Sequence, residues 1–104
     1  MTMTAGAMVL DTFGGPLTWR TFALPEPEPG ALLVRLLAAG VCGSDLDIVA
    51  GDDPRVPLPL IPGHEGLGEV LAVGGERNDA LGTPLVPGQL VAFSRGVTCG
   101  RCLY

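Results

Sequence analysis

Sixteen glycines and ten prolines make up a quarter of this 104-residue chain, and they restrict what it can fold into. Both residues favour turns over helix interiors, and proline also removes a backbone hydrogen-bond donor. Only 5% of the residues are aromatic, so the core must come mostly from Val, Leu, Ile and Ala. Short strands joined by shaped loops fit these features better than long helices. The length allows one hydrophobic core, so we expect a single compact domain.

The charge and the cysteine count narrow the choice of partners. A net charge of −5 argues against nucleic acid or an anionic membrane surface, because both would repel the chain. A small-molecule partner is expected instead. No segment approaches the roughly 18 apolar residues of a membrane span, and the first residues show no signal-peptide pattern, so we expect a cytoplasmic location. Three cysteines without a secretory signal favour metal or thiol chemistry over a disulfide framework.

The hydrophobic pattern predicts five short strands. The clearest pattern lies within Ala31–Gly40, where apolar residues from Leu32 to Ala38 occupy every second position and form a face expected to line the core. A proline-rich stretch over Leu24–Gly30 is predicted to be an exposed connector. The predicted strands are Ala7–Leu10 and Leu17–Ala23, joined by a hairpin-like turn at 13–16, and then Ala31–Gly40, Leu67–Val73 and Leu90–Phe93.

One short helix is predicted between the third and fourth strands. Ser44 is expected to cap it, Asp45 and Asp47 would lie near its positive N-terminal end, and Gly51 would end it after at most two turns. A parallel open sheet would need longer helices between its strands. The prediction is therefore a mainly β fold, an irregular β-barrel with one or two short helices.

Two glycine-bounded segments carry residues that could bind a metal ion. They are residues 40–46, Gly-Val-Cys-Gly-Ser-Asp-Leu, and residues 63–68, Gly-His-Glu-Gly-Leu-Gly. A catalytic zinc takes three protein ligands and keeps a fourth position open. Cys42 and His64 are suitable ligands, with Glu65 as a candidate third. Taken alone, Cys42 would be interpreted as a small buried hydrophobic residue, but its occurrence together with the only histidine favours a metal site.

In their order and separation these segments resemble the Cys-Gly-Ser/Thr-Asp-Leu and Gly-His-Glu motifs of the zinc-dependent medium-chain alcohol dehydrogenases. The resemblance covers essentially the whole chain. It implies that residues 1–104 form a GroES-like N-terminal catalytic domain, incomplete at its C-terminus, without the Rossmann domain that follows it in the family. It also implies that Cys42 and His64 are ligands of a catalytic zinc.

The resemblance also suggests a role for Glu65. Neighbouring side chains in extended backbone point in opposite directions, so Glu65 can share a metal with His64 only if the flanking glycines bend the chain. In the family the residue after the histidine is sometimes a ligand and otherwise a carboxylate just outside the ligand set. We favour a role for Glu65 as an exchangeable ligand, or as a carboxylate just outside the ligand set, over the interpretation that it is simply exposed to solvent.

The segment after Cys42 is expected to move the proton and to orient the histidine. Ser44 resembles the family's proton relay: zinc would polarise the alcohol, Ser44 would take up its proton, and hydride would leave for the nicotinamide. Asp45 resembles the carboxylate that orients the zinc-bound histidine. Asp47 is a departure, since many relatives have a histidine there as the outer end of the relay, and proton exit is expected to use water. Gln89 replaces a more usual Asp, a change interpreted as structural.

The sequence Cys99-Gly-Arg-Cys102 has the spacing of two thiolates on one tetrahedral metal. In the family this motif begins a structural zinc lobe with four cysteines, so the lobe is expected to be half present. A redox dithiol is a competing interpretation, but such motifs belong to a helix in a βαβ unit that the pattern does not predict. The third interpretation is that the two cysteines have no role in metal or redox chemistry.

The predicted function is that of the N-terminal catalytic domain of a zinc-dependent alcohol or polyol dehydrogenase. Residues 63–68 have the wrong glycine order for a dinucleotide fingerprint, so NAD or NADP would bind only to the missing domain. The chain alone is expected to be inactive, and the full-length enzyme to be a homo-oligomer. The alternative is a stand-alone, non-enzymatic zinc-binding or protein-interaction module. A quinone-reductase-like relative without zinc is disfavoured, because the candidate ligands would then share no purpose.

Overall fold

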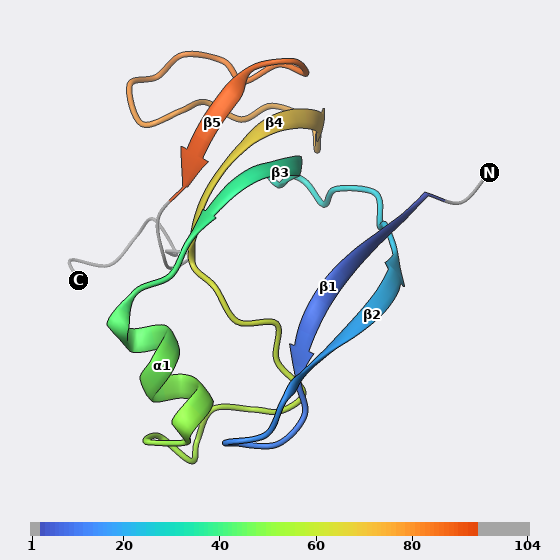
Figure 1. Ribbon diagram of the computed structural model, residues 1–104. Helices are drawn as coiled ribbons and strands as arrows, with labels where there is room; N and C mark the ends of the chain where they lie inside the picture. The colour runs from blue at the N-terminus through green and yellow to red at the C-terminus, as the bar shows by residue number, and fades with distance from the viewer. Residues whose placement is uncertain (1–2, 94–104) are drawn as a thin grey trace.

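The computed structural model describes residues 3–93, and within them the chain forms five strands and one helix (Figure 1). In chain order these elements are β1 (Thr4–Leu10), β2 (Leu17–Ala23), β3 (Leu32–Gly40), α1 (Gly43–Ala50), β4 (Glu65–Val73) and β5 (Leu90–Phe93). The mainly β class with one short helix confirms the prediction made from the density of glycine and proline. None of the helices in this part of the chain is long and apolar enough to cross a bilayer.

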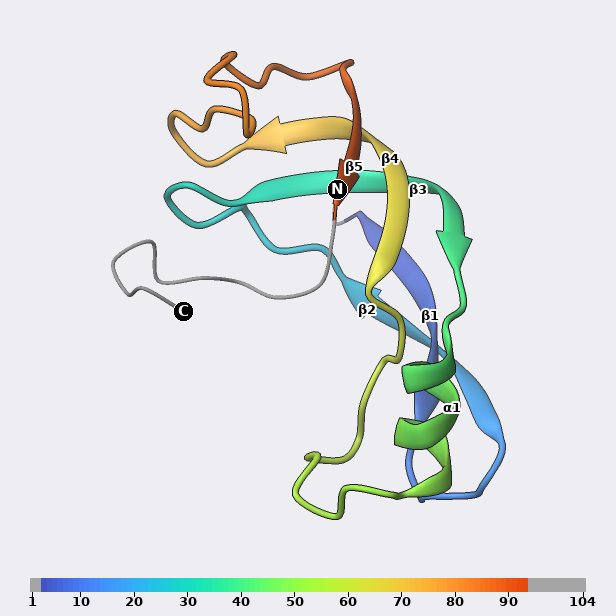
Figure 2. The ribbon, with the colours of Figure 1, turned by 90° about the vertical axis from the view of Figure 1, so that its left-hand side faces the viewer.

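The strands form two antiparallel sheets (Figures 1 and 2). β1 and β2 make a hairpin, and β3, β4 and β5 make a second sheet with β4 in the middle. Over residues 3–93 no continuous ladder joins the two sheets, so the barrel is open there. A backbone bridge between Leu10 and Leu60, with N···O distances of 2.7 and 3.0 Å, connects the hairpin to the loop before β4.

The hairpin confirms the predicted turn but begins earlier than the predicted strand. β2 has the predicted bounds, whereas β1 starts at Thr4 rather than Ala7. The extra residues are small and carry no alternating apolar pattern. They are held by pairing with β2, and the ring of Trp19 occupies the space that a β-carbon on Gly6 would need. A cross-strand contact of this kind leaves no periodic signal in the sequence.

The apolar face predicted for β3 lines the core only at its beginning. Leu32 and Val34 are half-buried, but Leu36 is 56% exposed, so the prediction is wrong for the second half of the strand. Two register shifts against β4 interrupt the alternation of side chains along β3. Among the described residues the buried apolar core is small and consists of Val9, Leu10 and Val70.

The helix α1 has the predicted length but a different N-cap. Cys42, not Ser44, occupies the N-cap position, with extended backbone dihedrals of −118° and 172°. The backbone nitrogen of Cys42 donates a hydrogen bond of 3.0 Å to Oδ2 of Asp45, which fixes the first turn. The predicted capping role of Ser44 is therefore wrong, because Ser44 lies inside the first turn and the capping box is formed by Cys42 and Asp45. Gly51 ends the helix as predicted, in the left-handed conformation with a φ of 85°.

The connectors largely match the sequence predictions. The proline-rich stretch before β3 is mostly exposed. β4 begins at Glu65, two residues before the predicted Leu67, because Gly66 and Glu65 pair with Ala39 and Gly40 at the end of β3. Since β4 starts at this point, Glu65 lies at the edge where β3 leads into α1.

Candidate metal centre

Cys42, His64 and Glu65 converge where β3 ends and β4 begins. Cys42 follows β3 and starts α1, while His64 immediately precedes β4 and Glu65 is its first residue. One potential ligand atom from each of the three lies within 4.8 Å of the other two. Cys42 and His64 are half-buried and Glu65 is exposed. The antiparallel register brings together two segments that are about twenty residues apart in the sequence.

The thiol of Cys42 has two polar neighbours. Its Sγ lies 3.0 Å from Nε2 of His64 and 2.8 Å from Oγ of Ser44. Ser44 lies in the first turn of α1, so its hydroxyl is held beside the sulfur by the helix that Cys42 caps. A hydroxyl at this position can exchange hydrogen bonds with the sulfur and with a polar molecule in the same place.

Asp45 is the one buried polar or charged side chain in the part of the chain that the structure describes, with 7% of its surface exposed. Its Oδ2 accepts the hydrogen bond from the Cys42 nitrogen, and its Oδ1 lies 3.2 Å from Nδ1 of His64. The contact with His64 has the distance of an ion pair but not the alignment of a hydrogen bond, and Oδ1 finds no other partner among residues 3–93. A buried carboxylate oxygen without a hydrogen bond is costly, so Asp45 favours an imidazole that presents Nδ1–H to it and holds a cation at Nε2.

The donor set fits zinc. A thiolate, an imidazole and a carboxylate are all ligands that zinc accepts, and three protein ligands leave one tetrahedral position for a substrate or water. Nδ1 of His64 faces Asp45 while Nε2 faces the sulfur of Cys42, so the imidazole is oriented with its ligand nitrogen toward the group. The buried Oδ1 atom directed at Nδ1 is the arrangement expected behind a metal-bound histidine.

The carboxylate of Glu65 reaches the group despite its position next to His64. Gly63 has a φ of 116°, a left-handed conformation that bends the chain directly before His64. On the other side, the carboxylate of Glu65 folds over the α-carbon of Gly40. Glu65 was predicted to share a metal with His64 only if a flanking glycine bends the chain, and Gly63 provides this bend.

Other predicted residues lie outside this group. The side chain of Asp47 is exposed and is not part of it, while its carbonyl oxygen accepts hydrogen bonds from Gly51 and Asp52 at the helix end. Gln89 has the predicted structural role, because its Oε1 accepts a hydrogen bond of 2.8 Å from the nitrogen of Val86. Cys99 and Cys102 lie outside the described residues, and the predictions for them stand unchanged.

Gly40 was not predicted as a site residue. In the sequence this glycine is only the boundary of the Cys42 segment. The signal that identifies it is three-dimensional: Gly40 pairs with Glu65 across β3 and β4. Nothing in the sequence around Gly40 reveals that partner, since the register depends on residues on two separate strands.

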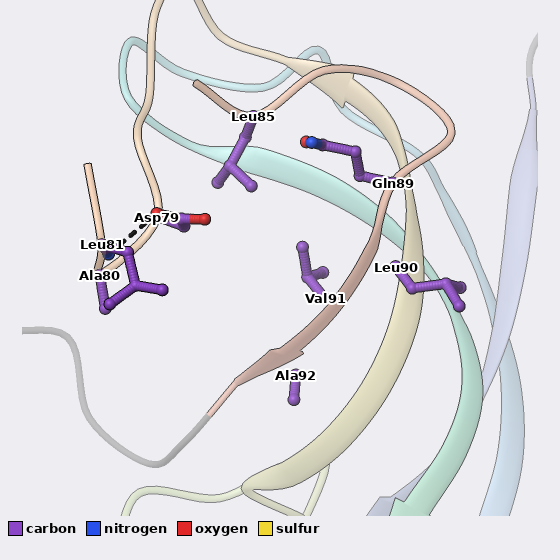
Figure 3. A pocket seen from close by; sticks show the side chains of 8 residues that line it. All are labelled: Asp79, Ala80, Leu81, Leu85, Gln89, Leu90, Val91 and Ala92. Carbon is purple, nitrogen blue, oxygen red and sulfur yellow. Dashed lines mark hydrogen bonds between the residues drawn. The ribbon is translucent and has the colours of Figure 1, made fainter. Parts of the chain in front are cut away.

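A surface hollow lies away from these residues, between β5 and the loop before it (Figure 3). It has a volume of about 320 Å³. Its one carboxylate, Asp79, accepts hydrogen bonds from the backbone nitrogens of Leu81 and Thr83, each at 2.9 Å. The carboxylate of Asp79 is therefore engaged in hydrogen bonds within its own loop. None of the three candidate metal ligands lines the hollow. The residues around it are Asp79, Ala80, Leu81, Leu85, Gln89, Leu90, Val91 and Ala92.

Comparisons with known proteins agree on one family. The family described as alcohol dehydrogenase GroES-like domain matches residues 28–104. A 5-exo-hydroxycamphor dehydrogenase of Pseudomonas putida is 41% identical over 86 residues, which cover 82% of this chain and 24% of that protein. An alcohol dehydrogenase of Rhizobium meliloti is 43% identical over 90 residues, which cover 81% of this chain and 26% of that protein.

A solved structure shows the same relationship. The crystal structure of an alcohol dehydrogenase from Thermotoga maritima superimposes with a TM-score of 0.88 at 50% sequence identity, over 96% of this chain and 27% of that one. The present chain thus spans about a quarter of the length of the relatives it matches.

Proposed function

This chain belongs to the medium-chain alcohol dehydrogenase family, where it corresponds to the GroES-like domain, and from this we propose that it binds a catalytic zinc. The observation that carries the proposal is the convergence of Cys42, His64 and Glu65 within 4.8 Å at the junction of β3, α1 and β4. We propose Cys42 and His64 as constant ligands. Glu65 is proposed as a third, exchangeable ligand, because its long and exposed side chain can leave the group without disturbing the strand.

The proposed reaction is hydride transfer from an alcohol or polyol to NAD or NADP. Zinc, when bound, supplies a Lewis acid that makes the hydroxyl of the substrate more acidic. Ser44 is proposed to receive that proton at Oγ; in support, its hydroxyl lies 2.8 Å from the sulfur of Cys42, in the first turn of α1. Because Asp47 is exposed and outside the group, water is proposed to carry the proton from Ser44 to the solvent.

Asp45 is proposed to hold the ligands in place. Its two oxygens contact the backbone of Cys42 and the ring of His64, so one buried carboxylate fixes both segments of the site. The ring of His64 is thereby prevented from turning its ligand nitrogen away from Cys42.

Binding of the nicotinamide cofactor and oxidation of the alcohol are proposed for an enzyme of the relatives' length. The 104 residues contain no dinucleotide fingerprint, and they correspond to about a quarter of the relatives' length. We therefore propose that these residues alone do not oxidise alcohols. A homo-oligomeric full-length enzyme and a second, structural zinc that uses Cys99 and Cys102 are part of the same proposal.

Elemental analysis of the purified chain tests the zinc site. We expect about one zinc ion per chain, as for a single catalytic site. The variants Cys42→Ala and His64→Ala should lose this zinc, and Cys99→Ala should keep it. Zinc that depends on Cys99 instead of Cys42, or a folded chain without zinc, would contradict the proposal. Turnover of any alcohol with NAD or NADP by the 104 residues alone would contradict the proposed inactivity.

A further inference from the structure

Gly40 lies directly opposite Glu65 at the end of the three-stranded sheet. It is the last residue of β3, Glu65 is the first residue of β4, and the two are partners in the antiparallel ladder. Side chains of directly paired residues point to the same face of a sheet. Whatever stands at position 40 therefore shares its space with the side chain of Glu65.

The side chain of Glu65 occupies the volume that a β-carbon at position 40 would need. Such an atom would overlap Oε2 of Glu65 and would lie 3.2 Å from its Cβ and 3.3 Å from its Cδ. Opposed β-carbons in a sheet are normally about 4.5–5.5 Å apart. The absence of a side chain at Gly40 is what lets the glutamate fold back across the strand end.

The glutamate, not the strand, would give way if the space were filled. The overlapping atom is the far end of a flexible side chain. The backbone of β4 is more tightly confined, because a β-carbon on Gly68 would meet the carbonyl oxygen of Arg35 at 2.5 Å, and one on Gly66 would overlap the ring of Phe93. An alanine at position 40 would accordingly displace the carboxylate of Glu65 and leave the sheet in register.

We propose that Gly40 is a positioning residue, which keeps the carboxylate of Glu65 beside Cys42 and His64 and so determines whether a bound metal ion has a third protein ligand. This inference rests on the proposed zinc site. With the carboxylate displaced to solvent, the site retains a thiolate and an imidazole, and the metal gains a second open position. Gly40 thereby controls the number of protein ligands without contacting the metal.

Cobalt(II) titration of the 104-residue chain tests the inference. The parent chain and all variants carry Cys99→Ser and Cys102→Ser, so that Cys42 is the one thiol of the chain. Cobalt replaces zinc in such sites, the near-ultraviolet thiolate band then reports Cys42, and the visible bands report the coordination number. We expect Gly40→Ala to weaken cobalt binding by about 10-fold or more, the range seen when a group that supports a metal site is lost. Its thiolate band should persist, and its visible spectrum should match that of Glu65→Ala.

Two further variants separate positioning from a general structural effect. Gly43→Ala is the matched control, because a β-carbon on Gly43 has nothing within 4 Å although this residue adjoins Cys42. It should bind cobalt like the parent chain. In the Glu65→Ala background, Gly40→Ala should cause no further loss, since the carboxylate it displaces is already gone.

The outcomes are distinguishable. A parent chain that binds no cobalt overturns the metal site and the role of Gly40 together. If the parent chain binds cobalt and Gly40→Ala leaves the affinity and the spectrum unchanged, the role of Gly40 alone is overturned. The same holds if Gly40→Ala weakens cobalt binding equally in the parent chain and in the Glu65→Ala background. If Gly40→Ala does not fold, the cobalt spectrum of Glu65→Ala decides the question. An unchanged spectrum in that variant would mean that Glu65 is not a ligand, so Gly40 would have no third ligand to position and the inference would be overturned.

Discussion

Oδ1 of Asp45 lies 3.2 Å from Nδ1 of His64 and joins the first turn of α1 to the residue that precedes β4. The other oxygen of the same carboxylate accepts the hydrogen bond from the Cys42 nitrogen. Asp45 is therefore both the partner that fixes the start of the helix and the contact that orients the imidazole. These two tasks can be separated experimentally, because the first needs only an acceptor oxygen while the second needs the negative charge.

Asp45→Asn should weaken zinc and cobalt binding by about 10- to 100-fold, the usual effect of removing an outer partner of a metal ligand. The amide can still accept the hydrogen bond from Cys42, but it no longer carries the charge that faces His64. Competition with a chromophoric chelator measures the change. Asp47→Asn, on the exposed side of the same helix, is the control and should bind as the parent does. Equal affinity of the two variants would refute the orienting role.

Ser44→Ala should lower the free energy of unfolding by less than about 1 kcal/mol, because it removes one hydrogen bond with the sulfur of Cys42 but no cap. Ser44 is not the N-cap, so its loss should not cost the roughly 1 kcal/mol of a removed cap. Asp45→Ala, which removes the carboxylate that fixes the first turn, should cost that amount or more. Urea unfolding of the three chains provides the comparison. A larger loss for Ser44→Ala than for Asp45→Ala would mean that Ser44 does cap the helix.

Leu10→Ala should lower the free energy of unfolding by about 2–5 kcal/mol, as for other fully buried leucines. Leu10 is 0% exposed, and its backbone forms the bridge to Leu60 that holds the hairpin against the rest of the fold. Leu81→Ala removes the same atoms from a side chain that is 92% exposed, and it should change stability by no more than about 0.5 kcal/mol. Similar losses in both variants, measured by thermal or urea unfolding, would contradict the small core described above.

Arg55→Gln should raise the pKa of Asp53. The pKa of this carboxyl is held below its ordinary value chiefly by the hydrogen bonds from the Arg55 side chain and also by the one from its backbone nitrogen. A lowered pKa in the folded state stabilises the fold above the unfolded-state pKa, and this contribution is lost as the pH falls through the folded-state value. Because the side chain of Arg55 is 89% exposed and that of Asp53 is 46% exposed, solvent screens the pair and the effect on stability should be small.

Carboxyl-carbon NMR titration measures the pKa of Asp53 directly. Arg77→Gln, which removes an arginine from a different loop, is the control and should leave the titration of Asp53 unchanged. An unaltered titration of Asp53 in Arg55→Gln would show that the ion pair does not persist in solution.

Residue types and short-range patterns were sufficient to predict most of the fold. β2 and β5 have the predicted bounds, and Gly51 ends α1 as predicted, because turn residues and local alternation act within a few positions of the chain. The segments around Cys42 and His64 could be selected for the same reason: thiolate and imidazole chemistry is a property of the residues themselves. The mainly β class followed from the density of glycine and proline, which exclude long helices.

The misassigned details depend on contacts that residue type and hydrophobic alternation do not report. The sequence allowed Ser44 to be the cap, and only the hydrogen bond from Cys42 to Asp45 assigns that position differently. The exposed second half of β3 depends on register shifts against β4, which local alternation does not report.

The sequence by itself therefore determined which chemistry is available, and the tertiary structure determined which of those groups meet. In the sequence Gly40 is only the boundary of the Cys42 segment, and its proposed role arises because the strand register sets it opposite Glu65. Glu65 in turn reaches Cys42 and His64 because a bend at Gly63 and the free space over Gly40 act together. Register and steric clearance are properties of paired strands, and for this reason only the folded chain could decide them.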